Sequence, residues 1–208
     1  MSKKTTISGI VLVLLVLATT PLLGTDNVSF LKWWLMTLVI GIGFYPVTAA
    51  LFPRFHDRGW MFSKVLGIAV SGFAVFALGS FGILSFTTSV CLGLVGALIL
   101  VSWIFGCFKV RVHAPEIDFL MMEEVLFFAF FLLWTYLAGF HPEAHGTEKF
   151  MDYGFMKAIM RSTAVPAEDL WYSGSGINYY YGGQFYAVFL TKITFTDVKQ
   201  TYHLMRTM

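Results

Sequence analysis

Long apolar runs dominate the pattern of hydrophobic and polar positions along this chain. Five runs have about the 20 apolar residues that a helix needs to cross a membrane core. They do not show the alternating or one-sided patterns of soluble elements, so they predict membrane-spanning helices. A sixth, shorter run carries Lys192 near its end, where the side chain is expected to extend towards lipid headgroups. The six runs are residues 7–23, 31–52, 60–84, 89–108, 119–140 and 179–195.

The composition agrees with this interpretation, because 57% of the residues are hydrophobic and only 12% are charged, unlike an average soluble domain. We predict an all-α, polytopic transmembrane bundle of about five to six helices. An extracytoplasmic loop, residues 141–178, is expected to carry short surface helices. A shift in composition near Pro115 divides the chain into a four-helix membrane module, residues 1–115, and the start of a second core, residues 116–208.

Positive charges in the short connections fall on one side of the predicted bundle. Since Lys and Arg are enriched in cytoplasmic loops, the amino terminus is predicted to be cytoplasmic and the loop extracytoplasmic, in a plasma membrane. The first run also resembles a signal peptide, although its length and the lack of a small-residue cleavage site favour a retained helix. The charges are Lys3, Lys4, Arg54, Arg58, Lys109 and Arg111.

Other charges and the cysteines suggest little chemistry of their own. The net charge of +2 implies no affinity for nucleic acid. Cys91 and Cys107 lie in one apolar run and are interpreted as small hydrophobic residues. Glu123 and Glu124 are expected to be solvated or paired near the cytoplasmic start of the fifth run, and Lys64 is expected to reach the headgroups.

The loop holds the best candidates for chemistry. Thr147 is predicted to cap a helix whose positive dipole end favours Glu148. Asp152 follows four residues later on the same face, which Phe155 and Ile159 continue. Two neighbouring carboxylates repel each other, so the pair becomes useful when a cation, a substrate hydroxyl or a transferring proton lies between them. A helix-start role for Glu148 and a solvated face remain open.

The rest of this helix is amphipathic. Lys157 and Arg161 lie opposite the acidic stripe, and the helix is predicted to rest on the membrane surface. A second short helix is predicted to begin near Pro166, with Asp169 in its first turn ahead of Trp171. Asp169 therefore has either a capping or a functional role.

Asn178 is predicted to cap the next helix, whose first turn would present Tyr179, Tyr180 and Tyr181. Three tyrosines at this position are typical of an interfacial aromatic belt or of sugar recognition.

His141 and His145 flank Glu143 at a metal-like spacing, but the sequence offers no further ligands nearby for zinc.

Three motifs together carry a family resemblance: Glu148-Lys-Phe-Met-Asp152, Asp169-Leu-Trp171 and Ile177-Asn-Tyr-Tyr-Tyr-Gly182. With them, residues 123–194 resemble the bacterial and archaeal YYY membrane-protein family, which is regarded as related to the GT-C superfamily of polytopic glycosyltransferases. The resemblance implies that the fifth run is the first core helix. It also implies that a sugar is transferred from a polyprenyl-phosphate donor at the extracytoplasmic face to a glycan or protein acceptor.

In such an enzyme Glu148 and Asp152 would act as the general base, or as ligands of a divalent metal ion in members that use one. The remaining implied substrate contacts are Lys149, Arg161, Asp169, Trp171, Asn178, Tyr179, Tyr180 and Tyr181. Ala138 stands where a basic residue is expected in relatives. The chain is also expected to be the amino-terminal part of a longer transferase.

Another class of function remains open beside the transferase. The loop of a noncatalytic membrane protein would bind a glycan, a lipid headgroup or a partner subunit. A transporter is disfavoured, because the apolar runs lack the charged or helix-breaking pairs expected at a midplane site.

Overall fold

The computed structural model describes residues 2–109, 116–143, 146 and 148–208. Arg111, Pro115, His145 and Thr147, on which predictions above depend, lie outside these residues. The described residues form helices and no β-strand, which confirms the all-α class. In chain order the elements are α1 (Lys3–Leu23), η1 (Gly24–Asp26), α2 (Asn27–Leu51), α3 (Trp60–Ser80), α4 (Thr88–Lys109), α5 (Ile117–Ala138), α6 (Lys149–Arg161), α7 (Gly182–Thr194) and α8 (Val198–Thr207).

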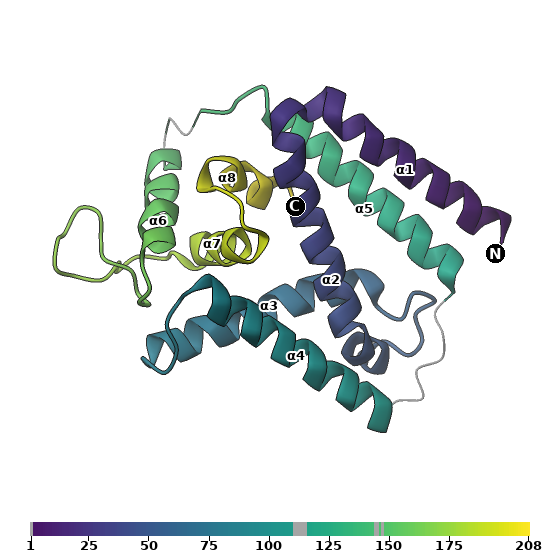
Figure 1. The fold of residues 1–208 in the computed structure, drawn as a ribbon, viewed down its shortest axis with the longest axis horizontal. Coiled ribbons are helices and arrows are strands. Elements are labelled where there is room, and N and C mark those ends of the chain that lie inside the picture. The colour runs from purple at the N-terminus through teal and green to yellow at the C-terminus, as the bar shows by residue number, and fades with distance from the viewer. Residues whose placement is uncertain (1, 110–115, 144–145, 147) are drawn as a thin grey trace.

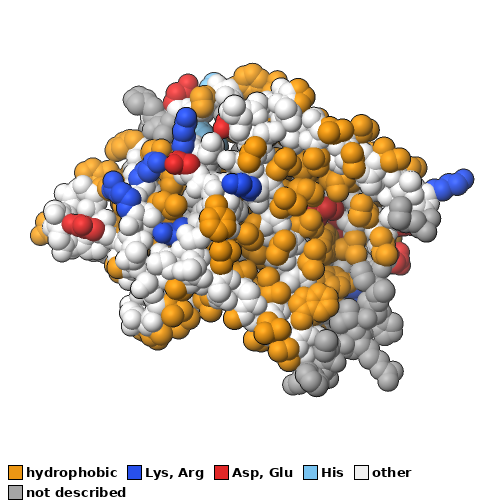
Figure 2. All heavy atoms as spheres, in the orientation of Figure 1, with side chains coloured by type: hydrophobic (Ala, Val, Ile, Leu, Met, Phe, Trp, Pro, Cys, Tyr) orange, Lys and Arg blue, Asp and Glu red, His pale blue; other side chains and the backbone are white. Residues whose placement is uncertain are grey.

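Three stretches of the described residues are long and apolar enough to cross a membrane. They are Lys3–Leu51, which joins α1 and α2 through η1, then Trp60–Ser80 and Thr88–Gly106. Hydrophobic side chains are exposed along α1 and α2, and in Figure 2 they gather over α1, α2 and α5. Several Lys and Arg side chains gather instead over the end that holds α6 and α8. These surfaces confirm a helical membrane protein.

Helices α1 and α5 lie side by side and run in the same direction (Figure 1). At their starts, the hydroxyls of Ser2 and Thr5 donate hydrogen bonds to Asp118. At their ends, Leu23 and Tyr136 line a common cavity. Helix α2 returns from this end and packs against α3 and α4. The amino-terminal helices therefore pack directly against the start of the second predicted core.

A buried carboxylate joins α2, α3 and α5. Glu124 accepts hydrogen bonds from Trp34 Nε1 at 2.7 Å and Trp60 Nε1 at 3.1 Å, and it pairs with the ammonium of Lys64. Lys64 is only 3% exposed and Glu124 5% exposed, and the ammonium also lies over the ring of Phe127. The prediction that Lys64 reaches the headgroups is thus wrong, whereas a paired role for Glu124 is confirmed.

Helix α7 is the centre of the carboxy-terminal helices and packs against α2, α3, α4, α6 and α8. It has 13 residues, fewer than the ~20 of a membrane crossing, so the sixth apolar run forms a short buried helix instead. Lys192 is 7% exposed and donates from Nζ to the carbonyl of Met160 at 3.1 Å. It does not extend to the headgroups, and burial lowers its pKa.

Candidate functional site

Helix α6 holds Asp152 against the first turn of α7. The helix follows Glu148, whose carbonyl accepts the backbone N–H of Asp152 at 2.9 Å, so the two acids are one turn apart as predicted. Gln184 Nε2 donates to Asp152 Oδ1 at 2.6 Å. Phe155 and Ile159 continue the stripe into the core. The apolar face of α6 therefore packs on α7 and α8 instead of facing lipid.

Asp152 lines a pocket of about 170 Å³ between α6, α7 and α8. Gln184, Tyr202 and Arg206 line the same pocket. The guanidinium of Arg206 lies 5.6 Å from the centre of the Tyr202 ring. An acid, an amide and a guanidinium thus share one small cavity. No pattern in the sequence associates Arg206 with Asp152, because the two residues are brought together only by the packing of α8.

The tyrosine triplet is divided between two surroundings. Tyr180 donates to Glu148 Oε2 over a long 3.5 Å, and its ring centre lies 4.0 Å from that of Tyr179. The hydrogen bond with Tyr179 is the main cause that raises the pKa of Tyr180 to about 12, and desolvation and the charge of Glu148 add to it. Tyr181 faces Phe76 of α3 instead. Tyr179 and Tyr180 are therefore the two tyrosines of the triplet that lie on the exposed surface beside Glu148.

The start of α7 differs from the prediction. The helix begins at Gly182, and its N-cap residue Tyr181 makes no side-chain capping hydrogen bond. Asn178 is exposed and does not cap the helix. Tyr179 and Tyr180 accordingly precede the helix instead of forming its first turn.

The predicted helix near Pro166 does not form either. Asp169 Oδ1 accepts the backbone N–H groups of Trp171 at 2.7 Å and Tyr172 at 3.1 Å. Such side-chain to backbone bonds compete with helix formation. Asp169 therefore stabilises a turn and does not cap a helix, and its functional role stays a prediction.

The other predicted contacts lie apart from Asp152. Trp171 is 58% exposed and packs edge-on against Phe155 at 5.4 Å between ring centres. Arg161 lines a separate pocket of about 210 Å³ with Asp169. Lys149 is half-buried at the first position of α6. The structure therefore brings together Asp152, Glu148 and Tyr180, whereas Arg161 lies in the separate pocket with Asp169.

The described residues do not fit a metal centre. Among them, no three His, Cys, Asp or Glu side chains lie close enough together to hold an ion. Asp152 is paired with an amide donor, which is not a ligand set for a divalent cation. The metal-ligand role implied for the two acids therefore has no support from this geometry.

Comparison with known proteins adds a family. No curated protein and no solved structure matches the chain. A family model described as "Uncharacterized membrane protein (DUF2298)" matches residues 70–207. The match begins within α3 and extends through α8, so it includes the Asp152 pocket and the tyrosine triplet. Since it covers about two-thirds of the residues, the chain belongs to the DUF2298 family of membrane proteins.

Proposed function

We propose that this protein transfers a sugar from a polyprenyl-phosphate donor to a hydroxyl acceptor at the extracytoplasmic membrane face, with Asp152 as general base. The observation that supports it most is the hydrogen bond from Gln184 Nε2 to Asp152 Oδ1 at 2.6 Å. This bond orients the carboxylate and leaves Oδ2 without a hydrogen bond to the described residues. A base needs a fixed position and a free oxygen to accept a hydroxyl proton.

The chemistry of the transfer suits the groups around this carboxylate. The acceptor oxygen attacks the anomeric carbon while the bond from that carbon to the phosphate oxygen breaks. The acceptor proton moves to Asp152, and polyprenyl phosphate leaves with the bonding electrons. The guanidinium of Arg206, in the same pocket, is suited to the charge of the departing phosphate.

The exposed aromatic surface around α6 is suited to a sugar. Trp171, Tyr179 and Tyr180 are 58%, 43% and 67% exposed, so their ring faces are available for stacking on a pyranose. Glu148 lies next to Tyr180 and offers an acceptor for sugar hydroxyls. In this assignment Glu148 binds the substrate and Asp152 moves the proton.

Turnover by reconstituted protein tests the proposal. The protein in liposomes receives a panel of labelled polyprenyl-phosphate sugars and acceptors, and release of polyprenyl phosphate is measured. Asp152→Asn is expected to lower kcat about 100-fold or more, because a general base contributes about that much. Gln184→Ala should lower kcat less, since the carboxylate remains but loses its orientation. Glu143→Gln, which changes an exposed loop carboxylate, is the matched control.

A noncatalytic glycan-binding protein is the second candidate, and the same three exposed rings support it. In that case the wild type releases no more polyprenyl phosphate than Asp152→Asn. Glycan binding would persist in Asp152→Asn and be lost in Trp171→Ala. That pair of results rejects the transferase.

A further inference from the structure

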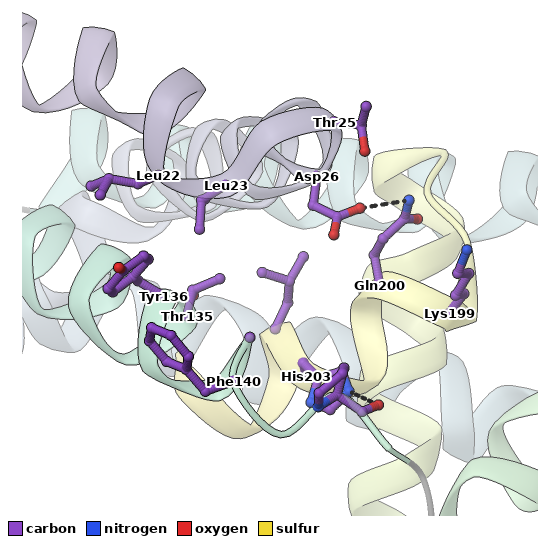
Figure 3. Close-up of a pocket in the computed structure, with 13 residues that line it drawn as sticks. Leu22, Leu23, Thr25, Asp26, Thr135, Tyr136, Phe140, Lys199, Gln200 and His203 are labelled. Atoms are coloured by element: carbon purple, nitrogen blue, oxygen red, sulfur yellow. Dashed lines mark hydrogen bonds between the residues drawn. The ribbon is translucent and has the colours of Figure 1, made fainter.

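A second and larger cavity lies on the other face of α8. Its volume is about 540 Å³, within the range of about 300–1,000 Å³ that is usual for small-molecule sites. The ends of α1 and α5, the short helix η1 and the helix α8 enclose it (Figure 3). Lys199, Gln200 and His203 face this cavity, whereas Tyr202 and Arg206 face the Asp152 pocket. Helix α8 therefore separates two different sites.

One end of the cavity is apolar. Leu22, Leu23, Tyr136 and Phe140 lie together on one side in Figure 3. Leu22 is 41% exposed and Phe140 61% exposed, at the ends of two helices whose outer surfaces are hydrophobic. This end of the cavity is therefore expected to lie beside the hydrocarbon region of the membrane.

The other end is polar and carries one charge of each sign. Asp26 Oδ1 accepts a hydrogen bond from Gln200 Nε2 at 3.3 Å. Lys199 lies beyond Gln200 on the same side (Figure 3), and it forms no ion pair with Asp26 among the described residues. His203 Nε2 lies 3.0 Å from the carbonyl of Pro142, which leaves Nδ1 for another partner. Both charges are thus available to a ligand.

We propose that this cavity binds a zwitterionic phospholipid of the ethanolamine class. Its phosphate pairs with Lys199, its ammonium pairs with Asp26, and its acyl chains follow Leu22 and Phe140 into the membrane. The opposite charges favour this occupant, because a purely anionic headgroup would meet the Asp26 carboxylate without a compensating cation. A site of this kind works independently of sugar transfer, since none of its residues lines the Asp152 pocket.

Native mass spectrometry of the detergent-solubilised protein tests the proposal with three added compounds. Phosphatidylethanolamine is expected to bind about tenfold more tightly than phosphatidylglycerol with the same chains, the equivalent of one charge-assisted hydrogen bond. Water-soluble phosphoethanolamine, which lacks the chains, should not bind measurably. Equal binding of the two lipids, or binding of phosphoethanolamine as tight as that of the lipid, would overturn the proposal.

Variants locate the binding at the cavity. Lys199→Gln should weaken phosphatidylethanolamine binding about tenfold, and Asp26→Asn should do the same while abolishing the preference over phosphatidylglycerol. Leu22→Trp fills the apolar end and should weaken both lipids without changing a charge. Arg54→Gln removes an exposed cation at the opposite end of the bundle and should change nothing. Unchanged binding in the three cavity variants would mean annular lipid only and reject the site.

Discussion

At the residue scale, Glu124 shows how one carboxylate can connect three helices of an apolar bundle. Its oxygens are satisfied by two indole N–H groups and one ammonium, from α2 and α3. A buried charge of this kind is costly to leave without its partner, although a neutral replacement of the whole pair is often tolerated. The Lys64–Glu124 pair is therefore expected to matter for stability mainly because the loss of one partner leaves the other charge buried and unpaired.

Single and double substitutions should differ accordingly. Lys64→Met and Glu124→Gln are each expected to reduce the free energy of unfolding by about 3–5 kcal/mol, because each leaves one charge buried alone. The double variant Lys64→Met/Glu124→Gln buries no charge and keeps a carbonyl acceptor for the indoles, so it should recover most of the loss. Reversible unfolding in mixed micelles, followed by circular dichroism, measures the three values. Additive losses in the double variant would contradict this account.

For the buried charged residues, the sequence indicated a depth along the helix but not the residues of other helices that they contact. Lys64 and Lys192 were both expected to extend to headgroups because hydropathy gives a depth along a helix and nothing about adjacent helices. In the structure a carboxylate from α5 reaches Lys64 and a carbonyl at the end of α6 reaches Lys192. Asp169 resembled a helix-start acid, yet its carboxylate stabilises a turn.

At the element scale, the five long apolar runs correspond to α1 to α5 with modest shifts of their ends. The sixth run could not be assigned in the same way, since a helix surrounded by protein is as apolar as one surrounded by lipid. Length separates them, and α7 is too short. The acidic stripe of α6 was predictable from its spacing, whereas the partner Gln184 comes from another element and was not.

The packing of α3 against α7 depends on a glycine. A Cβ at Gly72 would lie 2.3 Å from Cε1 of Tyr186, whereas a Cβ at Gly96 in α4 would meet nothing within 4 Å. Gly72→Ala should therefore destabilise the protein by about 1–3 kcal/mol. Gly96→Ala is the matched control and should be neutral or stabilising, because alanine favours helices. Equal effects of both substitutions on unfolding would show that the contact with Tyr186 is unimportant.

At the scale of the whole molecule, helix packing creates both cavities. Asp152 and Arg206 are 54 positions apart in the sequence, and only the position of α8 beside α6 and α7 unites them. No periodicity or charge pattern specifies such a contact, which explains why the family resemblance suggested Lys149 and Arg161 as substrate contacts but not Arg206.

The predicted orientation can be tested by thiol labelling of intact cells. Cysteine is placed at Ser173 in the loop or at His56 between α2 and α3, both exposed, with Cys91 and Cys107 changed to alanine. An impermeant maleimide should label Ser173→Cys at once, and His56→Cys only after permeabilisation, because positive charges retain the latter loop inside. The reverse pattern would contradict the orientation, and labelling of both sites in intact cells would contradict the fold.

Because α1 and α5 run in the same direction, they restrict the number of membrane crossings that can lie between them. Two crossings in the same direction require an odd number of crossings between them, and the predicted topology, with α2, α3 and α4 as crossings between α1 and α5, meets this requirement. The predicted topology of five crossings therefore places the amino-terminal end and the segment after α5 in different compartments, whichever way the bundle is inserted. Gain or loss of a single crossing ahead of α5 would deliver Asp152 to the opposite compartment with its local structure intact.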